Sequence, residues 1–205
     1  MNVLVTGFEA FGAVTANPSA AMVAALAARD FGATVQVRGV TLKTEYDWAG
    51  RRIRELMDDV LPELVLCLGV ARRSPEIKLE RVALNLNDCA DADNAGVVRR
   101  GMRIASDGPE AYFSRLPLER LEDRLKDIDE RVIISNHAGA YVCNHVFYTA
   151  SHHAASMASP PVCGFIHVPL PGEEGIKVNG AEHVETLSDV VAEVVRFVAG
   201  DGEGS

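Results

Sequence analysis

Cys143 lies where a turn of small residues, 138–140, runs into a helical pattern. A thiol at the start of a helix faces unpaired backbone N–H groups and the positive end of the helix dipole. Both favour the thiolate, which is the nucleophilic form of cysteine. The alternative is a buried and inert small side chain, which is the common fate of a free cysteine. We take Cys143 as the candidate nucleophile of a cysteine hydrolase.

A cysteine nucleophile needs a base within hydrogen-bond reach and a third group that orients the base. His167 is the candidate base, because it lies near the end of an apolar strand that stops at Pro169. Glu80 is the candidate orienting group, because a carboxylate among apolar strand residues must be paired or functional. Two alternatives stay open. His167 could be a hydrogen-bonded core histidine, and Glu80 a surface residue paired with Lys78 or Arg81.

The other cysteines and the polar clusters offer weaker chemistry. Cys67 and Cys163 lie within apolar strand patterns, and Cys89 has no adjacent histidine. The acidic stretch 88–94 resembles a calcium loop only loosely, since no glutamate follows at the proper spacing. The histidines at 145, 152 and 153 share a helical face but lack a matching carboxylate or thiolate. The sequence therefore predicts no metal site.

Strand and helix patterns alternate along the chain. Apolar or alternating runs predict strands over residues 2–6, 33–40, 64–68, 77–86, 131–135 and 162–168. Apolar residues at helical spacing predict helices over residues 18–28, 44–61, 117–128, 142–155 and 186–199. This alternation predicts an α/β fold with a mostly parallel sheet that is covered on both faces.

Binding sites of such sheets form at the carboxyl ends of the strands. The glycine-rich loop 7–12, Gly69, Cys143 and His167 all follow or end predicted strands, so we expect them at one edge. Residues 1–199 are predicted to form a single catalytic domain, and the polar residues 200–205 a mobile tail. The irregular stretch 88–109 is long enough to be functional or to form an interface.

Composition and charge exclude several classes of protein. The 205 residues are 48% hydrophobic and 24% charged, as in an ordinary globular domain. A formal net charge of -9 argues against a nucleic-acid partner. No apolar run reaches the roughly 20 residues that span a membrane. The first six residues read as a strand and lack the basic region of a signal peptide, so we expect a cytoplasmic protein with free thiols.

Five segments together resemble the pyroglutamyl peptidase I family, also called pyrrolidone-carboxylate peptidases. They occur in the family's order: TGFEAFG at 6–12 with NPS at 17–19, IKLERVALN at 77–85, DN at 93–94, GAYVCNHVFY at 139–148 and GFIHVP at 164–169. Each segment alone is modest. Five in order, with a glutamate, a cysteine and a histidine all in place, are specific.

The resemblance implies a Glu–Cys–His triad made of Glu80, Cys143 and His167. It implies a three-layer α/β/α sandwich with an open, twisted sheet, and a homo-oligomer that is a dimer or tetramer. The implied reaction removes an N-terminal pyroglutamyl residue from a peptide through a thioester on Cys143, with no metal or organic cofactor. His167 would protonate the leaving amine, and Glu80 would fix the tautomer of the imidazole.

The resemblance also implies an apolar slot for the pyroglutamyl ring, at positions occupied here by Phe8, Phe11, Tyr141 and Val142. Such a slot suits a neutral lactam and penalises a protonated N-terminus by desolvation. Tyr141 adds a hydroxyl to the usual phenylalanine, which would bond a substrate carbonyl or narrow the slot. For Phe8 and Phe11, a role as loop anchors in the core stays open.

Departures from the family pattern fall in the loops near these residues. Ala10 stands where proline is usual, and Arg72 and Arg73 stand where a pair of glycines is usual. Ala90 replaces the usual arginine, next to an added Asp91. An alternative function follows, in which the same triad acts on a different small acyl amide or lactam. The intact triad argues against a non-catalytic binding protein.

Overall fold

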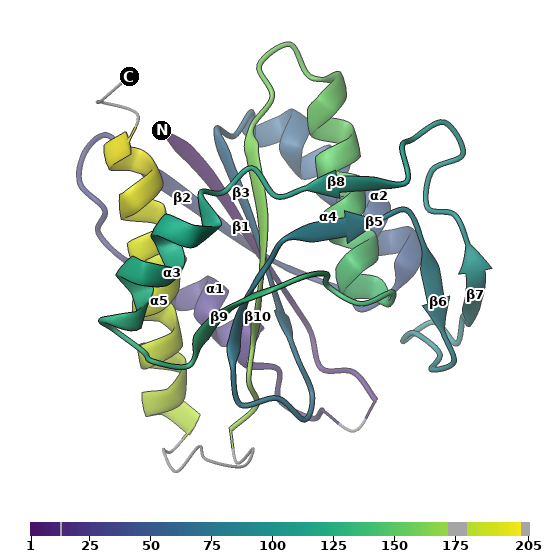
Figure 1. The fold of residues 1–205 in the computed structure, drawn as a ribbon, viewed down its shortest axis with the longest axis horizontal. Helices are drawn as coiled ribbons and strands as arrows, with labels where there is room; N and C mark the ends of the chain where they lie inside the picture. The colour runs from purple at the N-terminus through teal and green to yellow at the C-terminus, as the bar shows by residue number, and fades with distance from the viewer. Residues whose placement is uncertain (13, 172–179, 202–205) are drawn as a thin grey trace.

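A six-stranded sheet forms the centre of the molecule (Figure 1). The computed structural model describes residues 1–12, 14–171 and 180–201. The strands run in the order β2 (Gln36–Leu42), β1 (Asn2–Phe8), β3 (Leu64–Val70), β10 (Val162–Val168), β4 (Ile77–Glu80) and β9 (Val132–Ser135). Neighbouring strands are parallel except β10 and β4, which are antiparallel. The prediction of a mostly parallel sheet is confirmed.

Helices cover both faces of this sheet (Figure 1). On one face pack α1 (Pro18–Ala28), α3 (Leu118–Lys126) and α5 (Gly180–Asp201), and on the other α2 (Tyr46–Val60) and α4 (Val142–Ser156). Each layer buries its own cluster of apolar side chains against the sheet. The predicted three-layer α/β/α sandwich is therefore confirmed.

The three central strands are buried along nearly their whole length. Every residue of β3 is buried, and in β1 and β10 only the first residue is not. Helices on both faces require such continuous apolar runs, because neither side of these strands meets water. Each buried Val or Leu stabilises the fold by roughly 1.5–3 kcal/mol. These buried strands position the loops that follow their carboxyl ends.

Several predicted boundaries shift by a few residues. β1 and β3 each extend two residues further than predicted, and β2 begins at Gln36, after a turn at Gly32 with a φ of 84°. α5 begins six residues earlier than predicted and continues through Asp201, two residues into the predicted tail. Residues 202–205 of that tail lie outside the described residues.

The predicted strand 77–86 is two strands that belong to different sheets. β4 ends at Glu80, and β5 (Val82–Leu84) leaves the central sheet to pair with β8 (Ala111–Phe113). Arg81 is the break: its N–H donates to Ser135 O at 2.8 Å, while its carbonyl accepts from Ser114 N–H at 2.7 Å. The backbone of Arg81 thus makes hydrogen bonds beside both sheets. An apolar sequence pattern alone does not reveal this change of sheet.

The stretch 88–109 is not wholly irregular, and the prediction is wrong there. β6 (Asn87–Cys89) and β7 (Arg99–Met102) form an antiparallel pair with an irregular register. Both strands are polar or exposed, so they carry none of the apolar alternation from which strands are recognised.

Two residues within this stretch tie it to the rest of the fold. Asp93 Oδ2 accepts a hydrogen bond from the N–H of Tyr46, the first residue of α2, at 2.9 Å. The preceding residue, Glu45, makes no side-chain cap, so Asp93 supplies the cap from a distant segment. Asn94 Nδ2 donates to Ala10 O at 2.9 Å. The stretch is thereby fixed against α2 and the glycine-rich loop.

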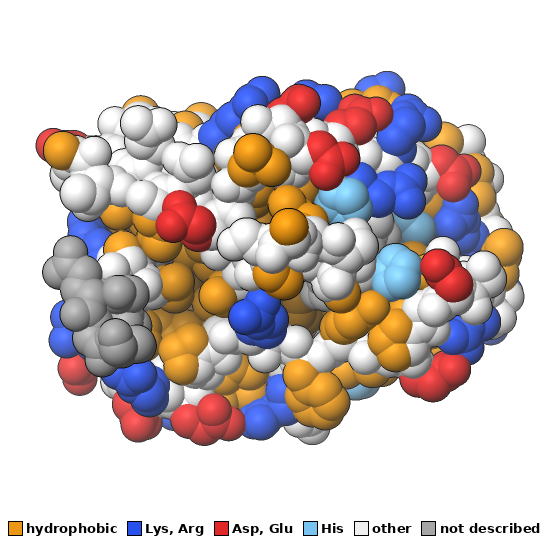
Figure 2. Space-filling model, turned by 90° about the horizontal axis from the view of Figure 1, so that it is seen from above, with side chains coloured by type: hydrophobic (Ala, Val, Ile, Leu, Met, Phe, Trp, Pro, Cys, Tyr) orange, Lys and Arg blue, Asp and Glu red, His pale blue; other side chains and the backbone are white. Residues whose placement is uncertain are grey.

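Charged side chains of both signs are interspersed on the face shown in Figure 2 and do not gather into one basic patch. That face offers no electrostatic footprint for nucleic acid. None of the described helices is both long and apolar enough to cross a membrane. Within residues 1–12, 14–171 and 180–201, no three His, Cys, Asp or Glu side chains are grouped to hold a metal ion.

Asn144 joins the first turn of α4 to β5. Its Nδ2 donates to Leu84 O and Leu86 O, each at 2.9 Å, and its Oδ1 accepts from Leu84 N–H at 2.8 Å. The side chain is fully buried. Three backbone groups therefore depend on one amide, which fixes the start of α4 in place.

We predict that Asn144→Ala lowers the free energy of unfolding by about 2–4 kcal/mol, because each buried polar group left unpaired costs about 1–3 kcal/mol. Urea unfolding followed by circular dichroism measures the loss. Ser156→Ala, at the exposed end of the same helix, is the matched control and should stay within about 0.5 kcal/mol of the parent. Equal stability of the two variants would contradict the role given to Asn144.

Candidate active site

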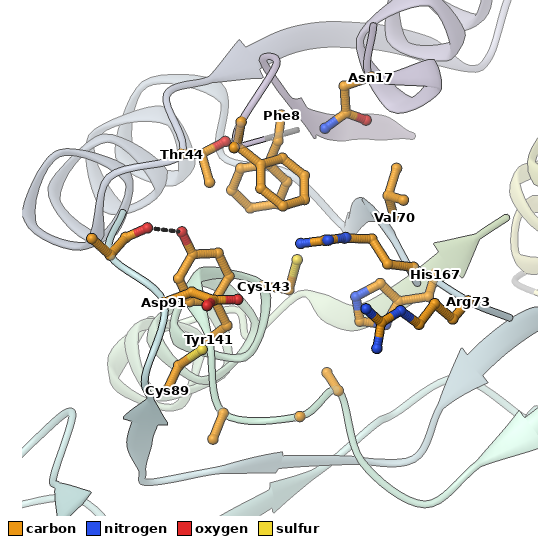
Figure 3. A pocket seen from close by; sticks show the side chains of 17 residues that line it. Phe8, Asn17, Thr44, Val70, Arg73, Cys89, Asp91, Tyr141, Cys143 and His167 are labelled. Carbon is orange, nitrogen blue, oxygen red and sulfur yellow. Dashed lines mark hydrogen bonds between the residues drawn. The ribbon is translucent and has the colours of Figure 1, made fainter. Parts of the chain in front are cut away.

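A cavity of about 770 Å³ opens at the carboxyl ends of β1, β3 and β10 (Figure 3). Phe8 ends β1, Val70 ends β3, and His167 is the last residue but one of β10. Tyr141 and Cys143 reach the cavity from the start of α4. Cys89 comes from the end of β6, and the surrounding loops contribute Phe11, Gly12, Asn17, Thr44, Arg72, Arg73, Asp91, Ala92 and residues 138–140. This is the edge of the sheet at which α/β folds place their sites.

Cys143 is the second residue of α4 and is partly exposed to the cavity. The turn into the helix passes through Gly139, whose φ of 77° is a conformation that favours glycine. Backbone N–H groups of a first helical turn lack intrahelical acceptors, and the helix dipole is positive there. A negative charge on Cys143 Sγ is therefore stabilised by its position.

His167 and Glu80 form a buried pair. His167 Nδ1 lies 2.7 Å from Glu80 Oε1, and the two side chains are 9% and 2% exposed. Glu80 is thus an interior residue, while Arg81 pairs with Glu119 instead. The antiparallel register of β4 and β10 creates the pair, because Glu80 lies opposite Phe165, two residues before His167. With Glu80 ionised, Nδ1–H of the ring donates to the carboxylate.

Burial and charge act on His167 in opposite directions. Burial lowers the pKa of an imidazole, but the hydrogen bonds and negative charges of Cys143 and Glu80 outweigh it and raise the pKa of His167 to about 9. Both partners therefore favour the protonated form of the ring, which lies between a sulfur and a carboxylate. By contrast, burial raises the pKa of Cys67 and of Cys163 to about 12, so both stay protonated thiols.

Gly69 makes room for the sulfur. A Cβ atom at this position would lie 2.9 Å from Cys143 Sγ and 2.8 Å from Phe165 Cζ, closer than such atoms pack. Gly69 is also the register partner of His167 in the β3–β10 pair. The missing side chain therefore lets the thiol rest on the strand that neighbours the imidazole.

Aromatic side chains form another wall of the cavity. The rings of Phe11 and Tyr141 have centroids 6.3 Å apart, and Phe8 and Tyr141 face the same cavity (Figure 3). Phe8 is 2% exposed, so it both anchors the core and borders the cavity. The Tyr141 hydroxyl donates to Ala92 O at 2.9 Å. That hydroxyl fastens the neighbouring loop, and its proton is not available to a substrate carbonyl.

Val142, the fourth residue predicted for the slot, lies elsewhere. Its side chain is fully buried in the core cluster and is absent from the cavity lining. Consecutive helical side chains point about 100° apart, so Val142 turns inward when Cys143 faces the cavity. The predicted side-chain contact between Val142 and a substrate ring is therefore corrected to a packing role.

Asn17 and Thr44 line the cavity, although the sequence did not single them out as site residues. Asn17 Nδ2 donates to Glu9 O at 3.1 Å, and its Oδ1 accepts from Ser19 N–H at 3.1 Å, so it holds the loop behind Phe8. Thr44 follows the carboxyl end of β2. The rule that sites form at carboxyl ends could have found Thr44.

A model of the pyroglutamyl peptidase family matches residues 1–197. The chain belongs to this family. It is 38% identical over 179 residues to pyrrolidone-carboxylate peptidase 2 of Photorhabdus laumondii subsp. laumondii, covering 87% of this chain and 81% of that protein. It is 35% identical to a pyrrolidone-carboxylate peptidase of Pyrococcus furiosus, covering 90% of this chain and 88% of that protein.

Solved structures of this peptidase family share the fold. A mutant pyrrolidone carboxyl peptidase of Pyrococcus furiosus has a TM-score of 0.87 at 30% sequence identity, over 97% of this chain and 100% of that chain. The predicted membership of the pyroglutamyl peptidase family, a family of cysteine hydrolases, is confirmed. The names of these relatives do not support the alternative of a different amide substrate.

We predict that Gly69→Ala displaces the thiol of this family member and slows both alkylation of Cys143 and hydrolysis. A misplacement of about 1 Å costs roughly 10²-fold in rate. Iodoacetamide labelling mapped by mass spectrometry measures the first effect. In the parent protein, Cys143 should react fastest, and the buried Cys67 and Cys163 should resist.

Gly164→Ala is the matched control for this experiment. A Cβ there would clash with Leu116 Cδ1 at 2.1 Å, so the variant disturbs an equally central strand without touching the sulfur. Its labelling rate at Cys143 should match the parent. The interpretation fails if Gly69→Ala labels as fast as the parent, or if Cys89 is the most reactive thiol.

Proposed function

We propose that this chain is a cysteine omega-peptidase that removes an N-terminal pyroglutamyl residue from peptides. The observation that carries the proposal is the buried pair of His167 Nδ1 and Glu80 Oε1, 2.7 Å apart, beside Cys143 in an aromatic-walled cavity. Membership of the pyroglutamyl peptidase family supports the choice of substrate. The substrate is a small peptide whose N-terminus is blocked by the lactam.

The proposed reaction starts from the thiolate of Cys143 and the imidazolium of His167. The sulfur attacks the pyroglutamyl carbonyl carbon, and the oxyanion that forms faces the backbone N–H groups of the first turn of α4. His167 gives its proton to the leaving nitrogen, the C–N bond breaks, and the shortened peptide departs. A thioester remains between Cys143 and the pyroglutamyl group.

Water completes the cycle. His167, now neutral, takes a proton from the water that attacks the thioester. The C–S bond breaks, pyroglutamate leaves, and the proton stays on the imidazole to restore the starting ion pair. Glu80 acts as a positioning residue throughout, because its bond to Nδ1 leaves Nε2 as the nitrogen that exchanges protons with the substrate.

The cavity walls match the chemistry of the pyroglutamyl group. The lactam is neutral and compact, so Phe8, Phe11 and Tyr141 can cover it without desolvating a charge. An ordinary peptide would bring a protonated amine to the same place, and its desolvation would disfavour binding. The slot therefore selects blocked N-termini over free ones.

We also propose that the enzyme works in the cytoplasm as a homo-oligomer, as the family resemblance implies. Exposed apolar side chains at Val98, Met102 and Phe113, which are 49%, 50% and 69% exposed, support a contact between copies. Light scattering of the purified protein measures its mass, and the mass of a single chain would refute this part.

We predict that Cys143→Ala abolishes hydrolysis of a chromogenic pyroglutamyl amide, because it removes the sulfur that rests against Gly69, the register partner of His167. Release of the chromophore gives the rate directly. Cys163→Ala, which removes a buried thiol away from the cavity lining, should remain active. The proposal is wrong if the parent enzyme does not hydrolyse the amide, or if Cys143→Ala keeps full activity.

We predict a pH profile whose kcat/KM falls as pH rises through about 9, because His167 then loses the proton that the leaving amine needs. Glu80→Gln removes a negative neighbour that raises the pKa of His167, so the falling limb should move to lower pH. The same change should lower kcat/KM by roughly 10²-fold or more.

Rates measured from about pH 6 to pH 10 test this effect of Glu80. Glu119→Gln serves as the control. It also replaces a carboxylate by an amide, but at an exposed residue that pairs with Arg81 on the surface. Its profile should overlay that of the parent. An unmoved limb in Glu80→Gln would show that Glu80 does not govern the protonation of His167.

A further inference from the structure

We propose that Arg72 and Arg73 select substrates that carry a carboxylate immediately after the pyroglutamyl residue. The carboxylate is either the side chain of a following Asp or Glu or the free C-terminus of a dipeptide. This inference rests on the proposed function and deepens it, since it concerns the half of the cavity that holds the leaving group.

The two arginines belong to the cavity and adjoin the candidate base. Both line it together with Cys143 and His167. They follow the end of β3, whose neighbour β10 carries His167, and Ala71 N–H donates to Val168 O at 3.1 Å. Figure 3 shows Arg73 and His167 lining the same cavity.

The chemistry of the reaction fixes which substrate residue this corner meets. A histidine that protonates the leaving nitrogen must lie within about 3 Å of it. The pyroglutamyl ring occupies the aromatic wall around Phe8, Phe11 and Tyr141. The residue after the scissile bond therefore extends past His167, toward the turn that carries Arg72 and Arg73.

Charges are segregated within the cavity. Asp91 lies beside Tyr141, at the aromatic end (Figure 3), whereas Arg72 and Arg73 line the cavity from the turn after β3, the strand next to β10. Glu80, the other nearby carboxylate, is buried and bonded to His167. No carboxylate of the described residues forms an ion pair with Arg72. Arg72 thus offers positive charge to an incoming peptide.

The backbone at Arg73 strengthens the inference. Its φ of 63° lies in the left-handed region, which costs a non-glycine residue roughly 1–2 kcal/mol. A glycine would avoid this strain. Strained non-glycine residues cluster at binding sites, where the side chain does something that glycine cannot.

The test compares kcat/KM for pyroglutamyl dipeptides that differ only in charge: pGlu-Glu-amide, pGlu-Gln-amide, pGlu-Lys-amide and pGlu-Gln with a free carboxylate. We expect the parent enzyme to prefer pGlu-Glu-amide over pGlu-Gln-amide by about twofold to fivefold at low salt, the range for an exposed ion pair. The preference should shrink as salt is added. A matching gain for the free-carboxylate peptide would identify the C-terminus as a second source of the charge.

Variants assign the preference to these side chains. In Arg72→Gln/Arg73→Gly, the ratio of acidic to neutral rates should fall to near unity, whereas Arg72→Lys/Arg73→Lys should keep most of it. Arg51→Gln, an exposed charge change on α2, is the matched control and should keep the parent's ratio. Because each ratio is taken within one variant, a loss of folded protein does not alter it.

Three results would overturn the inference. The first is that the parent shows no preference for acidic peptides. The second is that the double variant keeps the preference at full activity. The third is that the double variant loses activity on all peptides by the same factor, which also leaves the preference unchanged. In each of these cases the parent still hydrolyses pGlu-Gln-amide, so the proposed function stands. If the parent hydrolyses none of the peptides, the proposed function fails and this inference falls with it.

Discussion

The antiparallel pairing of β4 with β10 places a carboxylate against an imidazole in the interior of the molecule. Within the described residues, Glu80 Oε2 has no hydrogen-bond partner, so His167 is the group that compensates a buried negative charge. The dependence runs both ways, since Glu80 also helps to keep the imidazole protonated. Gly69 and the start of α4 then bring a sulfur to the same ring. The cavity is organised around this line of three groups.

Segments far apart in the sequence meet around these three groups because single side chains hold them together by hydrogen bonds. Asp93 caps α2 at Tyr46, Asn94 holds the glycine-rich loop through Ala10, and Tyr141 holds residue 92. Each bond spans dozens of residues, yet all converge on one rim of the cavity. The rim is therefore a connected structure, although most of it has no regular secondary structure.

The sequence predicts the layers of this fold well because buried strands and amphipathic helices leave strong apolar patterns. It does not predict where a strand changes sheets, because at Arg81 the cause is hydrogen bonding to Ser114 and Ser135, which lie far along the chain. The polar hairpin of β6 and β7 leaves no apolar signal either. Whether Glu80 lies inside or at the surface was open from spacing alone, since a strand pattern gives the face of a residue but not what covers it. The burial of Val142 could not be predicted, because matching a motif does not give the direction of a side chain.

The close contact between Gly69 and the sulfur has a consequence for oxidation. Cys143 Sγ rests where a neighbouring residue would normally have its first side-chain carbon, so the strand behind it leaves no space for another atom. An oxygen atom added to this sulfur must therefore point away from Gly69. On the cavity side it would occupy volume that the carbonyl of the proposed substrate needs. Under the proposed function, a sulfenic or sulfinic group on Cys143 would stand in the place of the substrate as well as remove the nucleophile.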